Sequence, residues 1–377
     1  MSSDKSSFQD PHILHSFRLL ISLALLLLLA GGVLGQQLSG PSPYSLCSTY
    51  VPEIGGIITA AASSTGIAVA ENKGRVRLLG NGTLETVWSA ELGGDIVSNL
   101  LISGDSLYVV TNTSSEEPSS RLRVINIETG LIRNSLEVIL DRSFLLKRAG
   151  DAILIVPSSS APAVLRTTQL TYSGNFTAWT PGDVFLFTDG ERALFASADG
   201  RLKVASILTG EPISEISGSS GKIEGAVLST AGRVIQGKNG GEIRAEAINS
   251  NGRDWSFKTG GTVVFLKSLN GKILSASNDN FLYLLSEESG KVVWRGRLPG
   301  RPLTGALLKD GSIAVAVLGE ERLLLFDSTN GKPRNTIELE ANEEVQPGGI
   351  IETEEGGIAA LTSRGLRLYA ASGGCTR

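Results

Sequence analysis

Histidine is nearly absent from this chain. The 377 residues include two histidines, His12 and His15, and both lie in a leading segment that we expect to be removed on export. The exported chain would then contain no imidazole. Ser-His-Asp triads, Cys-His dyads and His-ligated zinc or haem sites are thereby excluded from it.

Sequence motifs for binding phosphate or calcium are missing as well. The chain has no GxxxxGK[ST] loop and no DxDxDG loop. Residues 237–241 (GKNGG) resemble a phosphate cradle in composition alone, because residues 233–236 and 242–245 on either side have the pattern of strands and no helix follows. We interpret this segment as a hairpin turn.

The chain also lacks a basic run. Its 34 Lys and Arg residues are balanced by 38 Asp and Glu residues, and the formal net charge is −4. Nucleic-acid-binding proteins carry clustered positive charge. We therefore expect no nucleic-acid partner.

A single apolar run stands at the N-terminus, over residues 19–34, after Lys5 and Arg18. Its length falls between the roughly 7–15 apolar residues of a secretory signal and the about 20 residues of a membrane span. We predict that residues 1–35 are an export signal, with an uncleaved membrane anchor over 13–34 as the alternative. Both interpretations place the remainder outside the cytosol.

The composition changes after the apolar run. Residues 36–46, which contain Gly40, Pro41 and Pro43, are predicted to form an extended linker. Residues 47–377 have the composition of a globular protein with many turns, and 45 glycines occur in the whole chain. This length suits one large repeat domain or two small domains.

Residues 271–300 (GKILSASNDNFLYLLSEESGKVVWRGRLPG) contain the clearest structural unit. Three short apolar runs, the last ending at Trp294, are separated by an Asn-Asp-Asn turn and by an acidic turn that Gly290 closes. Glycine provides the positive φ that such a turn often needs. Together with the upstream run 263–266, the unit is predicted to be a four-stranded antiparallel meander.

Residues 281–294 (FLYLLSEESGKVVW) resemble the repeat of the quinoprotein-like β-propellers, which carry a PQQ-type repeat. The shared features are an apolar strand with Leu-Tyr, an acidic turn closed by glycine, and a strand ending in Trp. The turn glycine recurs at Gly82, Gly130, Gly174, Gly210, Gly252, Gly290, Gly331 and Gly373. The mean spacing of about 42 residues is typical of propeller repeats.

Eight turns predict an all-β fold, an eight-bladed β-propeller of four-stranded antiparallel blades. No unit contains the sustained 3.6-residue apolar stripe of a helical repeat. The unit over 142–180 matches least well, because Pro157 and Pro162 interrupt its middle. A seven-bladed ring with one irregular insertion is therefore the alternative.

The last unit stops at Gly373 without a fourth strand, and residues 48–53 at the other end of the domain are candidates to supply it. A propeller closed in this way loses an open sheet edge. The two cysteines, Cys47 and Cys375, would then lie close together. In an exported chain they are predicted to form a disulfide. Two buried thiols or a metal pair are the alternatives.

Four tryptophans follow their turn glycines closely: Trp88, Trp179, Trp255 and Trp294. In the resembling family such residues pack between adjacent blades. We predict the same role here in preference to stacking on a ligand.

Carboxylates are the remaining candidates for acid–base catalysis. Asp189, Glu191, Asp199, Asp279 and Asp310 all fall in predicted hairpin turns, where Asp favours hydrogen bonds to the local backbone. The sequence leaves open whether two of them converge as in a glycosidase.

Three Asn-x-Ser/Thr triplets, at Asn81, Asn112 and Asn175, are glycosylation candidates, and we predict that each lies in a turn or loop.

The resemblance covers nearly all of residues 50–377, and it implies two kinds of function. Some members are dehydrogenases that bind pyrroloquinoline quinone and calcium with the help of adjacent cysteines, which this chain lacks. Other members are non-catalytic propellers of the bacterial envelope that bind extended partners.

We predict a non-enzymatic extracytoplasmic scaffold or binding module without a cofactor or metal. It would be a monomer with protein partners at its rim loops or strand edges, and only its N-terminal segment would meet a membrane. The alternatives are a quinone-dependent dehydrogenase and a carboxylate-based carbohydrate-active enzyme.

Overall fold

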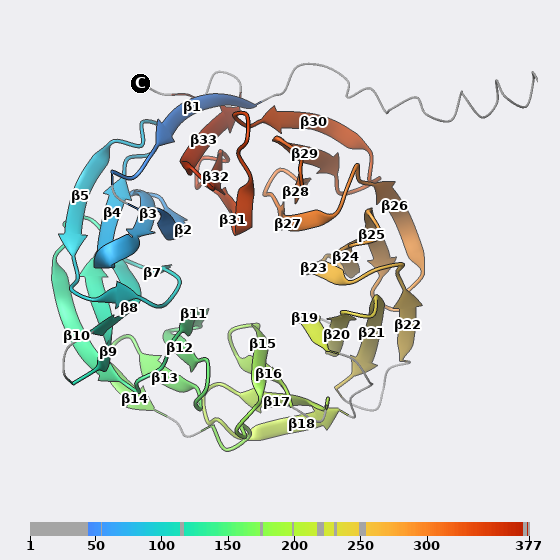
Figure 1. Cartoon of the computed structure of the whole chain (residues 1–377). Helices are drawn as coiled ribbons and strands as arrows, with labels where there is room; N and C mark the ends of the chain where they lie inside the picture. The colour runs from blue at the N-terminus through green and yellow to red at the C-terminus, as the bar shows by residue number, and fades with distance from the viewer. Residues whose placement is uncertain are drawn as a thin grey trace, which may run out of the picture. The chain divides into compact units, whose positions relative to one another are not determined.

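The computed structural model describes residues 44–53, 55–113, 117–173, 176–197, 200–216, 222–229, 232–248, 254–371 and 375. These residues form β-strands almost throughout, with one 3-10 turn at Asn72–Gly74. The strands make eight antiparallel sheets that follow one another around a ring (Figure 1). The predicted all-β, eight-bladed propeller is confirmed.

Each blade contributes its first strand to the centre of the ring and its last to the outside. The inner strands are β2 (Ile57–Ser63), β6 (Asp95–Ile96) with β7 (Leu101–Ser103), β11 (Phe144–Ala149), β15 (Val184–Thr188), β19 (Ile223–Leu228), β23 (Val263–Leu269), β27 (Pro302–Leu307) and β31 (Val345–Glu352). The second strands are β3 (Gly66–Glu71), β8 (Ser106–Thr113), β12 (Ala152–Pro157), β16 (Arg192–Ala196), β20 (Arg233–Lys238), β24 (Lys272–Ser277), β28 (Ser312–Val317) and β32 (Ile358–Thr362).

The third strands are β4 (Arg75–Leu79), β9 (Ser119–Asn126), β13 (Ala163–Arg166), β17 (Leu202–Ser206), β21 (Glu242–Ala247), β25 (Phe281–Ser286), β29 (Arg322–Asp327) and β33 (Gly365–Ala371). The outer strands are β5 (Thr86–Glu91), β10 (Ile132–Val138), β14 (Thr171–Ser173), β18 (Pro212–Ile216), β22 (Trp255–Lys258), β26 (Val292–Arg297), β30 (Pro333–Glu338) and β1 (Tyr44–Tyr50). Blades are numbered 1 to 8 from the blade that begins with β2.

The apolar core lies between the blades. Second strands such as β3 and β28 are buried along their whole length, because both faces of each sheet are covered by neighbouring sheets. The core divides into eight apolar clusters, one at each interface between neighbouring blades. At the interface of blades 8 and 1, for example, Val69 packs with Ala359 and Leu368. A single blade cannot bury its own apolar faces, so the ring as a whole completes the core.

Blade 8 combines the two ends of the domain. Strand β1 pairs antiparallel with β33, from Tyr44 opposite Ala371 to Tyr50 opposite Leu366. The prediction that residues 48–53 form this strand was wrong in its bounds. The strand begins at Tyr44, inside the expected linker 36–46, and Pro52 follows its end. Proline has no N–H to donate to a ladder.

The predicted Cys47–Cys375 disulfide is present, with the two Cα atoms 5.3 Å apart and a sequence separation of 328. It links β1 to the segment after β33. The alternatives of two free thiols or a metal pair are therefore wrong.

Two further expectations are corrected. The prolines in residues 142–180 lie at the end of β12 and in its connection to β13, so blade 3 is complete and the seven-bladed alternative is wrong. Asn112 lies in strand β8 opposite Ser120, whereas a loop was expected. Its polar neighbours in sequence continue the ladder as far as Thr113.

The export segment 1–35, the turn residues Gly174, Gly252 and Gly373, and Asn175 and Asp199 lie outside the described residues. Within the described part of the chain, no helix has the length and apolar character needed to cross a membrane.

Candidate functional site

Three of the four tryptophans join an outer strand to the turn of the next blade. The Trp294 Nε1–H donates to the carbonyl of Ser328 at 3.0 Å, and the ring lies against Gly331. Trp255 lies in the same way against Gly290, with its N–H on the Glu287 carbonyl at 2.7 Å.

Trp88 has the same arrangement against Gly130, with its N–H on the carbonyl of Ile127 at 2.8 Å. Trp179 is half-buried beside the cluster between blades 3 and 4. Packing between blades therefore accounts for the surfaces of these rings, and we assign none of them to ligand stacking.

The candidate carboxylates are held locally in their turns. Asp189 accepts hydrogen bonds from the backbone and the guanidinium of Arg192, at 2.8 and 2.6 Å. Asp310 accepts from the backbone N–H of Ser312 at 2.7 Å. Both lie in hairpins that follow an inner strand.

Asp279 lies in the β24–β25 hairpin, at the opposite end of its blade, and accepts from Tyr283 and from the Gly260 N–H at 2.7 and 2.6 Å. Where the structure describes these carboxylates, it brings no two of them into contact. Across the described ranges, no three His, Cys, Asp or Glu side chains are grouped so that they could hold a metal ion.

A more ordered polar centre lies on the connection between blades 2 and 3. Asp141 is 6% exposed, and one carboxylate oxygen accepts the Arg142 N–H at 2.6 Å and the Ser158 hydroxyl. The other oxygen accepts the Ser159 N–H at 2.9 Å and the Ser159 hydroxyl at 2.6 Å. Burial alone would raise the pKa of Asp141, but these donors outweigh it and hold the pKa well below its usual range.

Asn112 extends this hydrogen-bond network into blade 2. Its side-chain N–H donates to the carbonyl of Asp141 at 2.7 Å, and its side-chain oxygen accepts from the Ser120 hydroxyl at 2.7 Å. The connection between the blades is thus held by β8 on one side and by the β12–β13 loop on the other. One N–H of the Asn112 side chain is thus engaged within the fold.

A cavity of about 690 Å³ opens beside this network, lined by Asn112, Leu140, Asp141, Arg142, Ser158 and Ser159. Ile139 and Leu140, at its edge in sequence, remain 56% and 52% exposed. We name Ile139, Leu140 and Arg142 with this cavity the blade 2–3 ledge. Apolar side chains on a rigid support suit protein binding, because little further ordering is needed on association.

The ledge was not predicted from the sequence. Asp141 and the serines that bind it are 17 and 18 residues apart in the chain, and the pairing of β11 with β12 brings them together. The adjacent apolar pair Ile139-Leu140 just after a strand was the one local signal available.

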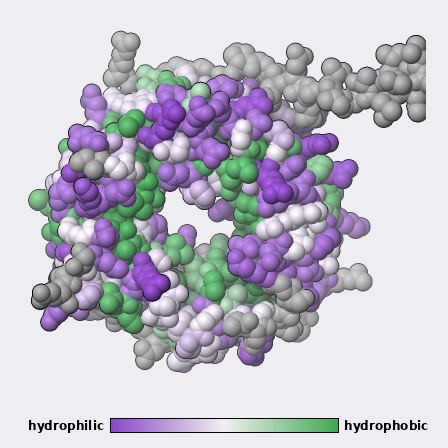
Figure 2. Space-filling model, in the orientation of Figure 1, coloured by the Kyte–Doolittle hydropathy of each residue, from purple (hydrophilic) through white to green (hydrophobic). Residues whose placement is uncertain are grey.

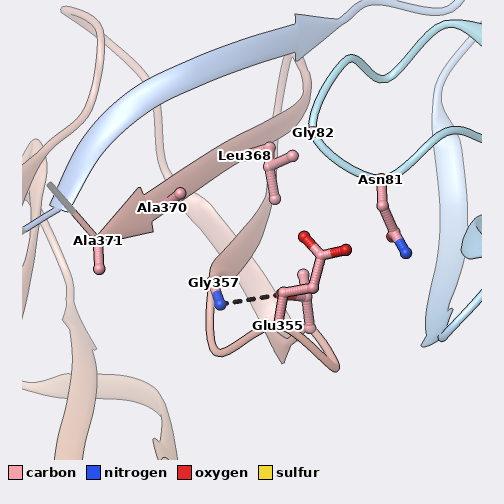
Figure 3. Close-up of a pocket in the computed structure, with 8 residues that line it drawn as sticks. Asn81, Gly82, Glu355, Gly357, Leu368, Ala370 and Ala371 are labelled. Atoms are coloured by element: carbon pink, nitrogen blue, oxygen red, sulfur yellow. Dashed lines mark hydrogen bonds between the residues drawn. The ribbon is translucent and has the colours of Figure 1, made fainter. Parts of the chain in front are cut away.

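A second, smaller pocket lies where blades 8 and 1 meet (Figure 3). Its volume is about 70 Å³, and its lining includes Asn81 from the β4–β5 turn, Glu355 from the β31–β32 turn and Leu368 from β33. Figure 3 shows the Glu355 carboxylate directed into the space between the two turns. This volume holds about two waters, so the pocket is too small for an organic substrate.

The described geometry can be compared with known proteins. A family model described as the outer membrane protein assembly factor BamB matches residues 29–261. The structure of the computationally designed Ika8 protein aligns with a TM-score of 0.71 at 13% identity, covering 86% of this chain and 99% of that chain. None of the curated proteins matches the chain.

Two natural propellers align as well. BamB from Moraxella catarrhalis has a TM-score of 0.62 at 13% identity, covering 86% of this chain and 99% of that chain. The C-terminal WD40 domain of Sif2 has a TM-score of 0.69 at 15% identity, covering 87% of this chain and 98% of that chain. At such identities, the structural likeness shows the fold alone.

Proposed function

Because the chain belongs to the family of the outer membrane protein assembly factor BamB, we propose that it is a non-enzymatic extracytoplasmic scaffold. It binds another protein of an envelope assembly machinery. The observation that carries this proposal is the blade 2–3 ledge, which presents two exposed apolar side chains on a hydrogen-bonded support. The Cys47–Cys375 disulfide and the predicted export segment support a location outside the cytosol.

The outer strand next to the ledge enlarges the binding surface. Strand β10 is the last strand of its sheet, so one of its edges has no partner strand among the described residues. Leu131 just before it and Ile132 at its start are 68% and 43% exposed, and Ile139 follows its end. If an extended segment of a partner paired with this edge, the adjoining residues of the partner would lie against the ledge.

We expect a few side chains to provide most of the binding free energy. Interface hot spots are side chains that become fully desolvated in the complex, whereas peripheral contacts contribute little. Leu140 lines the cavity and is half exposed, so a partner side chain that fills the cavity would bury it.

The test is site-specific photo-crosslinking in the native envelope. A photoreactive phenylalanine analogue at position 140 is expected to give one discrete adduct with a partner protein, and Leu140→Glu should reduce capture of that partner at least tenfold. The matched control is position 293, since Val293 is 48% exposed on the outer strand of blade 6. Equal adducts at both positions, or capture that Leu140→Glu leaves unchanged, would contradict the proposal.

A further inference from the structure

Two lysines lie at the same level of the ring on blades that are not neighbours. Lys147 of β11 pairs with Leu154, and the hairpin closes two residues later at Ala149. Lys267 of β23 pairs with Leu274, and that hairpin closes two residues later at Leu269. The inner strands run side by side around the centre, so equal distance from the hairpin means equal height (Figure 1).

The equivalent position on the other blades is uncharged. It is occupied by Ala61, Leu101, Phe187, Val227, Ala306 and Ile351. The two lysines are therefore the charged groups of an otherwise apolar level, and we name these eight residues the lysine level.

Lys147 and Lys267 belong to the innermost strands β11 and β23, and Figure 2 shows an opening at the centre of the ring that these strands surround. Their side chains are exposed although they belong to innermost strands. No carboxylate of the described residues lies within ion-pair distance of either lysine. The surrounding atoms of the ring desolvate the Lys147 ammonium and lower its pKa, and the charge of Lys267 lowers it further. Because blades 3 and 6 are separated by other blades, this repulsion acts across the opening.

Three exposed apolar side chains lie at a second level, three residues earlier on the inner strands. Ile58, Val184 and Val264, on blades 1, 4 and 6, are 41%, 59% and 37% exposed. A β-bulge on each of these strands takes up one residue, so at about 3.3 Å of rise per residue they lie about 7–8 Å from the lysine level along the strands. Glu224 is the carboxylate at this level, and it is paired with Lys222 at 3.2 Å. Apolar regions also border the opening in Figure 2.

We propose that the central opening binds an organic anion with an apolar body about 8 Å long. Its carboxylate or phosphate group lies between Lys147 and Lys267, and its body contacts Ile58, Val184 and Val264. Two ammonium groups that repel each other gain from a shared anion, and the exposed apolar side chains gain from being covered. This site lies apart from the blade 2–3 ledge and does not depend on a protein partner.

The test is isothermal titration of the exported chain with decanoate and with decyl phosphate. We expect Lys147→Gln and Lys267→Gln each to weaken binding at least tenfold. Lys291→Gln removes the same charge from the exposed β25–β26 turn and should leave the affinity unchanged. Decanol, which has the same chain without the charge, should bind at least tenfold more weakly than decanoate. A preference between the two anions assigns the head group.

The apolar part is tested with Val264→Ser, which should weaken decanoate several-fold without changing the melting temperature, since Val264 is partly exposed in a β-bulge. The proposal is overturned if decanoate binds the lysine variants as well as it binds the unaltered chain. It is also overturned if decanol binds as tightly as decanoate. Circular dichroism melts of each variant separate lost binding from lost folding.

Discussion

At the scale of single residues, Asp141 shows how one buried carboxylate can position a surface. Its carboxylate accepts hydrogen bonds from the side chains of Ser158 and Ser159 and from the backbone N–H groups of Arg142 and Ser159. Hydrogen bonds to a charged group each contribute more than neutral ones. The exposed side chains of Ile139 and Leu140 are therefore held in place by a carboxylate that is itself buried.

Asp141→Asn should lower the free energy of unfolding by about 2–3 kcal/mol at pH 7, because it removes the charge from several buried hydrogen bonds. Guanidinium denaturation measures this change. Asp105→Asn is the matched control, since the exposed Asp105 pairs with Arg133 on the surface, and it should give no measurable change. Equal effects of the two substitutions would contradict the role of Asp141.

Because the pKa of Asp141 is lowered by folding, we expect its contribution to the free energy of unfolding to depend on pH. The pKa of Asp141 is lower in the folded protein than in the unfolded chain, so its stabilisation is complete above the unfolded carboxyl pKa of about 3.9. As the pH falls below this value, the unfolded chain takes up the proton first and the stabilisation is lost. The stability difference between the unaltered chain and Asp141→Asn should therefore shrink between pH 5 and pH 2, as measured by urea denaturation across this range.

At the scale of elements, the contact between a tryptophan and a turn glycine joins successive blades. Gly331 adopts a φ of +69°, and a Cβ added there would lie 2.4 Å from the ring of Trp294. The glycine is thus needed both for the backbone of the turn and for the approach of the indole. The repeating turn glycine and the repeating tryptophan serve the same contact.

Gly331→Ala should destabilise the protein by about 1–3 kcal/mol more than Gly319→Ala, because overpacking adds to the cost of a positive φ. Gly319 is the matched control: its φ is +75°, and a Cβ there would meet nothing within 4 Å. Thermal denaturation of both variants isolates the clash with the indole. If the two variants melt at the same temperature, the Trp294 ring can move aside without loss of stability, and the packing role is contradicted.

At the scale of the whole molecule, closure of the ring joins the two ends of the domain. Strand β1 completes blade 8, and the disulfide links Cys47 to Cys375 across a separation of 328 residues. Without this strand, β33 would present an open edge and the apolar cluster between blades 8 and 1 would lose Cys47 and Tyr50. The disulfide restricts the separation of the two ends in the unfolded chain.

Reduction of the disulfide should lower the free energy of unfolding by about 2–5 kcal/mol. Guanidinium denaturation with and without dithiothreitol measures the change. The double variant Cys47→Ser with Cys375→Ser should match the reduced protein and should not respond to dithiothreitol. An oxidised protein that is no more stable than the reduced one would show that closure by β1 alone is sufficient.

Sequence reasoning predicted most of the fold but little of the surface. The eight turns and the pairing of the cysteines followed from residues that repeat or that flank the domain. The start of β1 was misplaced because its length depends on the partner strand β33. Asn112 was misplaced because its neighbours are polar, although Ser120 pairs with it across the ladder.

The sequence by itself determined the architecture, because a blade is made of consecutive strands whose apolar runs and turn residues lie next to one another in the chain. The tertiary structure alone decided the sites. Asp141 meets Ser158 and Ser159 because β11 pairs with β12, which brings the residues before one strand beside the residues after the other. Lys147 and Lys267 face one opening only because a closed ring places inner strands from distant parts of the chain at the same height. The arrangement of the two lysines depends on the geometry of ring closure, which no local stretch of sequence contains.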